Sequence, residues 1–169
     1  MSLDDFLALR DRPKAEYVDG QAIVSPPASS FHNDIQRRLA NRIEADLVPE
    51  VHVRVDAGWR HADRLRVPDI AVFEAKEDLV YDDHLPILVV EVVSPSTASE
   101  DTVRKAGEYQ SAGIAQYWIV DRDHRTLTIF GNDGRGWQQL LALDDDHPFG
   151  GIDVGEWGEV SIDLSELFG

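Results

Sequence analysis

Two segments of the chain repeat apolar side chains with the period of an amphipathic helix. Residues 29–48 carry an apolar residue at every fourth position after a serine cap and before a proline, which predicts a helix. Residues 99–112 form the second expected helix, and Gly113 ends it because glycine tolerates the left-handed backbone that follows a last turn. A shorter helix is expected over residues 3–9.

The remaining apolar segments alternate or run continuously, as strands do. Residues 51–55 alternate valine with polar residues, which is typical of a half-buried strand. Residues 86–93 are nearly all apolar, so we expect them in the centre of a sheet that is covered on both faces. Residues 65–73 are expected to form one strand. The other expected strands are a hairpin over 17–24 with an Asp-Gly turn, and segments 116–120, 126–130, 137–143 and 159–164.

This order of elements predicts the fold class. A helix, a hairpin and a second helix are followed by three strands, a third helix and further hairpins. Such an order is typical of an α+β (mixed α/β) protein in which a mixed β-sheet is flanked by helices. The chain has no internal repeat or linker, so we expect a single domain over residues 1–169.

The composition excludes several classes of site. The chain has 169 residues, of which 43% are hydrophobic, and it contains no cysteine. Disulfides, thiolate zinc sites and a cysteine nucleophile are therefore excluded. No stretch reaches the roughly 18 apolar residues of a membrane span, and the first residues lack the basic start and apolar run of a signal peptide. We expect a cytoplasmic protein that does not associate with a membrane.

The net charge of −16 is unevenly distributed. Residues 141–169 contain many acidic residues and no Lys or Arg, whereas residues 31–66 are rich in arginine and nearly neutral. A strongly acidic surface repels phosphate backbones at long range. The acidic stretch could be a solvated surface. The arginines could form an anion-binding face, or they could be ion-pair partners for the acidic residues.

Two carboxylates interrupt apolar strands and are the leading candidates for chemistry. Asp69 follows Pro68, and Glu91 is flanked by valines on both sides. A carboxylate within an apolar strand is costly unless a cation balances it. Two carboxylates on strands expected to be neighbours therefore suggest a site for Mg²⁺ or Mn²⁺, with the backbone carbonyl of Val92 as a third ligand. Alternatively, Asp69 could be a strand-edge residue that binds backbone amides.

Phosphodiester hydrolysis is one reaction that uses such a metal, which activates water and stabilises charge on the phosphate. A lysine is useful beside the metal, because an ammonium group can hold the attacking water or stabilise negative charge on the phosphate. The chain contains three lysines, and Lys105 lies on the helix that follows the strand of Glu91. A strand-turn-helix unit folds back on itself, so Lys105 can reach the carboxyl end of that strand. The alternative is an ion pair between Lys105 and Asp101, one helical turn away.

Several motifs resemble one known family. Residues 91–97 (EVVSPST) are followed by Asp101, Lys105, Tyr109, Gly113 and the segment 117–121 (YWIVD), and they are preceded by 16–20 (EYVDG), 25–27 (SPP), His32 and Pro68-Asp69. In this order the motifs resemble the signature of the Uma-type putative restriction endonucleases. The resemblance spans about residues 16–130.

That family is similar to the PD-(D/E)XK nuclease superfamily. The resemblance implies a restriction-endonuclease-like core and magnesium-dependent cleavage of DNA. It also implies that Asp69 and Glu91 are metal ligands, and that Glu16 is the additional carboxylate that joins them. The superfamily has a lysine two positions after the glutamate, where this chain has Val93. The resemblance therefore implies that Lys105 takes the place of that catalytic lysine.

Other interpretations stay open beside the endonuclease. The acidic charge and Val93 favour a catalytically inactive nuclease fold that acts as a binding or regulatory protein. A nuclease that acts on RNA or another small substrate needs no large basic cleft. Glu16 could instead pair with an arginine, and His32 could be a first-turn helix residue, a phosphate contact or a proton shuttle. Analogy with the superfamily implies a homodimer.

Overall fold

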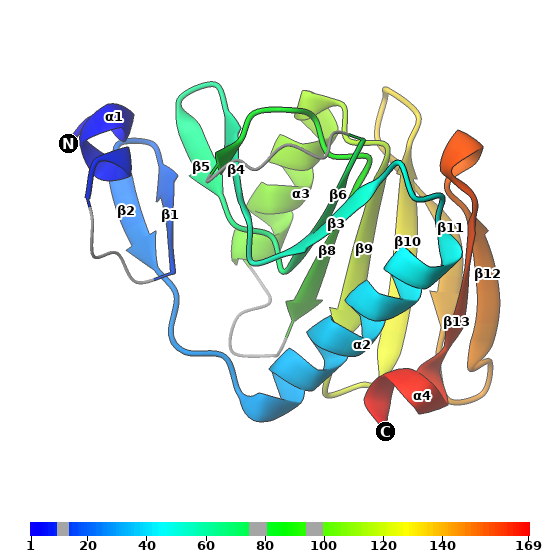
Figure 1. The fold of residues 1–169 in the computed structure, drawn as a ribbon. Helices are drawn as coiled ribbons and strands as arrows, with labels where there is room; N and C mark the ends of the chain where they lie inside the picture. The colour runs from blue at the N-terminus through cyan, green and yellow to red at the C-terminus, as the bar shows by residue number, and fades with distance from the viewer. Residues whose placement is uncertain (10–13, 75–80, 94–99) are drawn as a thin grey trace.

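Six strands form the central sheet of the protein (Figure 1). The structure is a computed structural model that describes residues 1–9, 14–74, 81–93 and 100–169. The strands are β3 (His52–Val55), β6 (Ile70–Phe73), β8 (Leu88–Val93), β9 (Gln116–Asp121), β10 (Thr126–Asn132) and β11 (Trp137–Leu143). Their order is β11-β10-β9-β8-β6-β3. β8 and β9 pair in parallel, whereas the other neighbours pair antiparallel. The expected mixed sheet is confirmed.

Two helices cover opposite faces of this sheet, α2 (Ser30–Asp46) and α3 (Glu100–Ala112) (Figure 1). Successive side chains of a strand point to opposite faces. Along β6 and β8 one set packs with α2 and comprises Ile70, Val72, Leu88 and Val90, whereas the other set packs with α3 and comprises Ala71, Phe73 and Val89. β8 is therefore buried on both sides, as its apolar sequence predicts. Gly113 ends α3 with a φ of 91°.

A second sheet carries the beginning of the chain. Its strands are β1 (Ala15–Val18), β2 (Gln21–Val24), β4 (Gly58–His61), β5 (Arg64–Arg66) and β7 (Tyr81–Asp82), in the order β2-β1-β5-β4-β7. The expected hairpin is confirmed, and Asp19 and Gly20 form its turn with φ angles of 50° and 81°. The short helix α1 (Leu3–Leu7) packs on this sheet, with the rings of Phe6 and Tyr17 5.4 Å apart.

The single strand expected over residues 65–73 is wrong. β5 ends at Arg66 in the second sheet, whereas β6 begins at Ile70 in the central sheet. Pro68 lies between them and breaks the strand, because proline has no backbone N–H to donate to a neighbouring strand. This corner places Asp69 at the junction of the two sheets, immediately before β6.

The last part of the chain adds elements that the sequence pattern did not predict. The strands β12 (Phe149–Asp153) and β13 (Glu159–Asp163) form a two-stranded sheet, with the turn η1 (Gly155–Trp157) between them and the helix α4 (Leu164–Phe168) after them. Among these C-terminal elements, β13 was expected, whereas β12 and α4 were not. The short strands β4 and β7 of the second sheet were not expected either. The first residue of the helix expected over 99–112 lies outside the described residues. Among the helices of the described segments, none is long and apolar enough to cross a membrane.

Candidate functional site

Asp69 and Glu91 meet across two adjacent antiparallel strands. β6 and β8 pair Ile70 with Val90, and Asp69 and Glu91 are the next residues outward from this pair. The charge of Asp69 contributes to the raised pKa of Glu91, so the two carboxylates are near each other. The backbone N–H of Val92 donates to Oδ2 of Asp69 at 2.7 Å, which ties the two strand ends together. The structure thus brings together the two carboxylates that the sequence singled out.

Asp69 is buried and has different partners on its two carboxylate oxygens. Oδ2 accepts the backbone N–H described above, whereas Oδ1 lies 3.2 Å from Nε2 of His32 and 3.3 Å from Nζ of Lys14. Nε2 of Gln36 donates a hydrogen bond of 2.6 Å to the backbone carbonyl of Asp69. Burial alone would raise the pKa of Asp69, but the hydrogen bond with His32 and the charges of His32 and Lys14 outweigh burial and lower that pKa.

Two side chains contact the same carboxylate oxygen of Glu91. Oε1 accepts a hydrogen bond from the hydroxyl of Tyr109 at 2.7 Å and lies 3.3 Å from Nζ of Lys105. Burial raises the pKa of Glu91 to about 7, and the charges of Asp69 and Glu16 act in the same direction against that of Lys105. The charge of Lys105 therefore does not outweigh burial and the two neighbouring carboxylates at Glu91.

Glu16 has both carboxylate oxygens occupied. Oε1 accepts the backbone N–H of Val67 at 3.0 Å and lies 3.1 Å from Nζ of Lys105, whereas Oε2 accepts from Arg66 at 2.7 Å. Glu108 binds the same Arg66 through two hydrogen bonds of 2.7 and 2.8 Å. Glu16 thus pairs with an arginine, as one interpretation of the sequence predicted, and it also contacts Lys105. The ammonium group of Lys105 contacts both Glu16 and Glu91, at 3.1 and 3.3 Å.

The sequence analysis did not single out Lys14, Gln36 or Arg66, and it named Tyr109 as a motif residue without giving it a role. Lys14 precedes Glu16 by two positions, a spacing that places both side chains on the same side of a strand. Tyr109 follows Lys105 by four positions, which is one turn of α3. Both spacings were visible in the sequence and could have indicated these residues. Arg66 had no such signal, because its partners come from β1 and α3.

Oε2 of Glu91 and Oδ1 of Asp69 are oxygen ligands of the kind that suits a hard divalent cation. Within the described residues, Oε2 of Glu91 has no hydrogen-bond donor, and Oδ1 of Asp69 is contacted by the side chains of Lys14 and His32. Oxygen ligands from one or two carboxylates are those that Mg²⁺ and Mn²⁺ prefer. The side chain of Asp101, the alternative partner of Lys105, is outside the described part of the structure.

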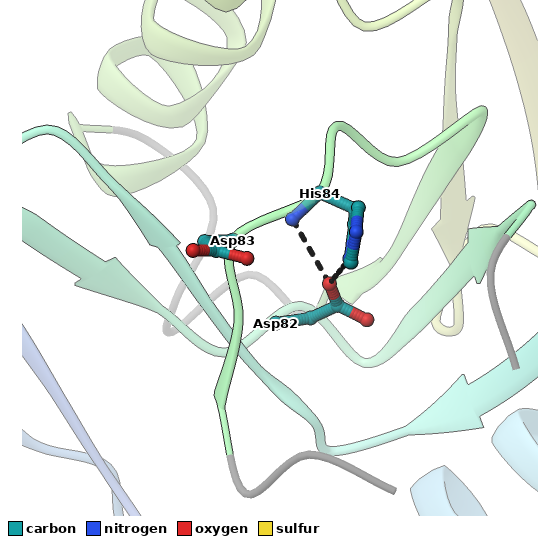
Figure 2. Close-up of side chains that lie close together, drawn as sticks. All are labelled: Asp82, Asp83 and His84. Atoms are coloured by element: carbon teal, nitrogen blue, oxygen red, sulfur yellow. Dashed lines mark hydrogen bonds and ion pairs between the residues drawn. The ribbon is translucent and has the colours of Figure 1, made fainter. Parts of the chain in front are cut away.

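A second group of possible ligand atoms follows β7 and is shown in Figure 2. Atoms of Asp82, Asp83 and His84 lie within 4.8 Å of one another. Oδ1 of Asp82 accepts the backbone N–H of His84 at 2.9 Å and lies 2.8 Å from its Nδ1. Oδ2 of Asp82 lies 3.4 Å from Arg54. Bonds within the turn and a neighbouring arginine therefore account for this group, and we assign no metal to it.

Six arginines of the arginine-rich segment pair with acidic residues, whereas Arg38 donates to the backbone carbonyl of Leu167. The pairs are Arg37 with Asp34, Arg42 with Asp46 and Glu166, Arg54 with Asp82, Arg60 with Asp4, Arg64 with Asp19 and Glu108, and Arg66 with Glu16 and Glu108. This favours the second interpretation of the sequence, in which these arginines are ion-pair partners.

Comparison with known proteins supports the resemblance drawn from the motifs. The fold is similar to a crystal structure described as a putative nuclease belonging to DUF820 from Anabaena variabilis, with a TM-score of 0.81 and 22% sequence identity over 99% of this chain and 97% of that chain. At this identity the likeness shows the fold, and it confirms the expected fold class. No curated protein matches the chain. A family model described as "Uma2: Putative restriction endonuclease" matches residues 3–152, so the chain belongs to this family.

Proposed function

We propose that this protein is a metal-dependent endonuclease that hydrolyses phosphodiester bonds of DNA at a PD-(D/E)XK-type site. One observation carries the proposal. Asp69 and Glu91, both buried, are the residues next to the Ile70–Val90 pair of two adjacent strands, the Val92 N–H binds Asp69, and Lys105 contacts Glu91 at 3.3 Å. Membership of the Uma2 family supports a nuclease. The DNA substrate and the Mg²⁺ (or Mn²⁺) cofactor belong to the proposal.

The metal ligands of this proposal are Asp69, Glu91 and the backbone carbonyl of Val92. Oε2 of Glu91 is assigned to the cation because Oε1 binds Tyr109 and Lys105. Oδ1 of Asp69 is assigned to it because the Val92 N–H holds Oδ2, and the cation would share Oδ1 with the side chains of His32 and Lys14. A bound Mg²⁺ would activate water and offset negative charge on the phosphate. The two strands hold the ligands in register, and burial limits competition from solvent.

Lys105 assists the reaction by stabilising charge on the phosphate or by holding the attacking water. Val93 cannot do so, because valine has no hydrogen-bond donor. Glu16 tunes the site through Lys105: it holds the ammonium group at 3.1 Å, and Arg66 fixes its other oxygen. Glu16 is therefore proposed to orient the lysine rather than to bind the metal directly.

The proposal is tested with the variants Asp69→Asn and Glu91→Gln on supercoiled DNA with Mg²⁺ or Mn²⁺. Each is expected to lower metal-dependent cleavage at least about 100-fold, because a charged ligand is lost. Asp146→Asn is the matched control, since it removes one exposed acidic charge from the C-terminal part of the chain. Cleavage that persists at the wild-type rate in both site variants would rule out this site.

The net charge of −16 favours one alternative, a nuclease fold that binds a partner without turnover. Such a protein would bind neither Mn²⁺ nor Mg²⁺ in a saturable way at Asp69. A panel of double-stranded DNA, single-stranded DNA and RNA separates the DNA endonuclease from a nuclease that acts on RNA or a smaller substrate. Cleavage of RNA alone would replace the DNA assignment and leave the metal site in place.

We also propose that residues 1–169 fold as a single domain, that the protein is cytoplasmic, and that it assembles as a homodimer to cut both strands of a duplex. Sedimentation equilibrium at the concentration used for cleavage tests the assembly. A mass of about twice the 18.9 kDa of the chain supports the dimer, and a monomer at that concentration refutes it.

A further inference from the structure

The hydroxyl of Tyr109 contacts the carboxylate assigned to the metal. It donates to Oε1 of Glu91 at 2.7 Å, and the Tyr109 side chain is fully buried. Lys105 lies one turn earlier on α3 and contacts the same oxygen at 3.3 Å. Both donors come from one face of the helix, because residues four apart lie on the same side. Two side chains of α3 therefore bind Oε1 of Glu91, whereas Oε2 is not bound by either of them.

The ring that carries this hydroxyl is fixed by aromatic packing. Its centroid lies 6.0 Å from that of Trp59 and 5.5 Å from that of Tyr117, which in turn packs on Trp137 at 5.8 Å. Nε1 of Trp137 donates to the backbone carbonyl of Ala106 at 2.9 Å, which ties β11 to α3. Close packing of this kind holds a side chain in one rotamer. The hydroxyl therefore has one position relative to β8.

We propose that Tyr109 is a positioning residue that turns Oε2 of Glu91 toward the divalent cation by holding Oε1. The inference rests on the proposed function, in which Glu91 is a metal ligand. Asp69 differs, since the Val92 N–H holds Oδ2 while the side chains of His32 and Lys14 contact Oδ1. A hydrogen bond to the second oxygen of a ligating carboxylate restricts its rotation, and its loss typically weakens metal binding about 10- to 100-fold.

A buried tyrosine also needs a hydrogen-bond partner for its own stability. The two roles differ in what they predict. A structural role predicts that loss of the hydroxyl lowers the melting temperature and leaves metal affinity unchanged. The positioning role predicts a change in metal affinity in a protein that remains folded.

The test compares Tyr109→Phe with Tyr117→Phe. Both remove one hydroxyl from the same buried aromatic cluster and keep the ring, but the hydroxyl of Tyr109 is the one bonded to Glu91. Calorimetric titration with Mn²⁺ alone gives the dissociation constant. Tyr109→Phe is expected to raise it about tenfold, and Tyr117→Phe less than about twofold. The Mg²⁺ concentration for half-maximal DNA cleavage should rise by a similar factor in Tyr109→Phe, whereas the rate at saturating Mg²⁺ should fall less than about threefold.

Two results would overturn the inference while leaving the proposed function intact. One is a wild-type Mn²⁺ affinity in Tyr109→Phe, and the other is an equal loss of affinity in both tyrosine variants. A wild-type protein that binds no Mn²⁺ overturns the proposed function, and with it this inference. Near-ultraviolet circular dichroism of each variant establishes that the aromatic cluster is intact before the affinities are compared.

Discussion

Nζ of Lys14 lies 3.3 Å from Oδ1 of Asp69, the oxygen that the proposed function assigns to the metal. Lys14 also forms an ion pair with Asp56. Burial would lower the pKa of Lys14, but the charge of Asp69 and the hydrogen bond with Asp56 outweigh burial and raise that pKa. In the metal-free protein a lysine therefore supplies positive charge where a divalent cation is proposed to bind.

Lys14 and the metal should compete for Asp69. In Lys14→Gln the competing charge is lost, so the dissociation constant for Mn²⁺ is expected to fall about threefold to tenfold, on the scale of a partly screened charge interaction. Calorimetric titration measures this constant. Arg42→Gln is the matched control, because it removes the same charge from an ion pair with Asp46 and Glu166. An affinity that rises no more in Lys14→Gln than in the control would contradict the competition.

The raised pKa of Glu91 predicts a pH dependence of stability in the absence of metal. The ordinary pKa of 4.5 rises to about 7 in the folded protein, so between these values the folded state binds more protons than the unfolded state. The free energy of unfolding should therefore fall as the pH rises from about 4.5 to about 7. Glu91→Gln cannot titrate and should lack this part of the fall.

Urea denaturation of both proteins from about pH 5 to about pH 8 measures the effect. The quantity of interest is the difference between wild type and Glu91→Gln, because other acidic residues titrate in both proteins. If this difference is constant across the pH range, Glu91 keeps an ordinary pKa in the folded protein.

Arg66 is expected to be important for stability. Its side chain is 2% exposed and binds Glu16 and Glu108. Arg66→Met leaves two carboxylates without their shared cation, and breaking a buried ion pair typically costs about 3–5 kcal/mol. The free energy of unfolding in urea measures this loss. Arg60→Met is the control for an exposed pair with Asp4 and should cost less than about 1 kcal/mol. Equal losses in the two variants would show that the buried network adds nothing.

Lys105 should affect cleavage more than metal binding. Lys105→Met is expected to lower the rate of DNA cleavage about 100-fold or more at saturating Mg²⁺, because a donor to the developing charge is lost. Binding of Mn²⁺ should persist, since the carboxylates remain. Lys105→Arg keeps the charge and should recover part of the rate. A variant that cleaves normally would assign Lys105 to structure alone, through its contacts with Glu16 and Glu91.

Much of the centre of the site could be predicted from the sequence, because a single carboxylate in an apolar strand is conspicuous. Asp69 and Glu91 met this description, and the period of α3 brought Lys105 toward Glu91. The contact of Lys14 with Asp69 could not be predicted in this way, since the residues lie 55 positions apart and immediately precede strands of different sheets. It depends on how the two sheets pack.

The corner at Pro68 shows a related limit of the sequence pattern. Residues 65–73 keep an apolar pattern through the point where the chain leaves one sheet and enters the other. Hydrophobicity does not distinguish one strand from two strands that join at a bend. The proline was the available signal, and it explains why Asp69 lies at the junction and can contact the backbone of β8 and a side chain of α2.

The metal site proposed for Asp69 and Glu91 depends on the register of β6 against β8. A slip of one residue would turn Glu91 to the face that packs with α2, because side chains alternate along a strand. Such a molecule would keep most of its β-structure but could not bring its two carboxylates to one cation. During refolding, Mn²⁺ would therefore add its binding free energy only to molecules with the native register. Mn²⁺ present during refolding is therefore expected to raise the fraction of molecules that reach the native register.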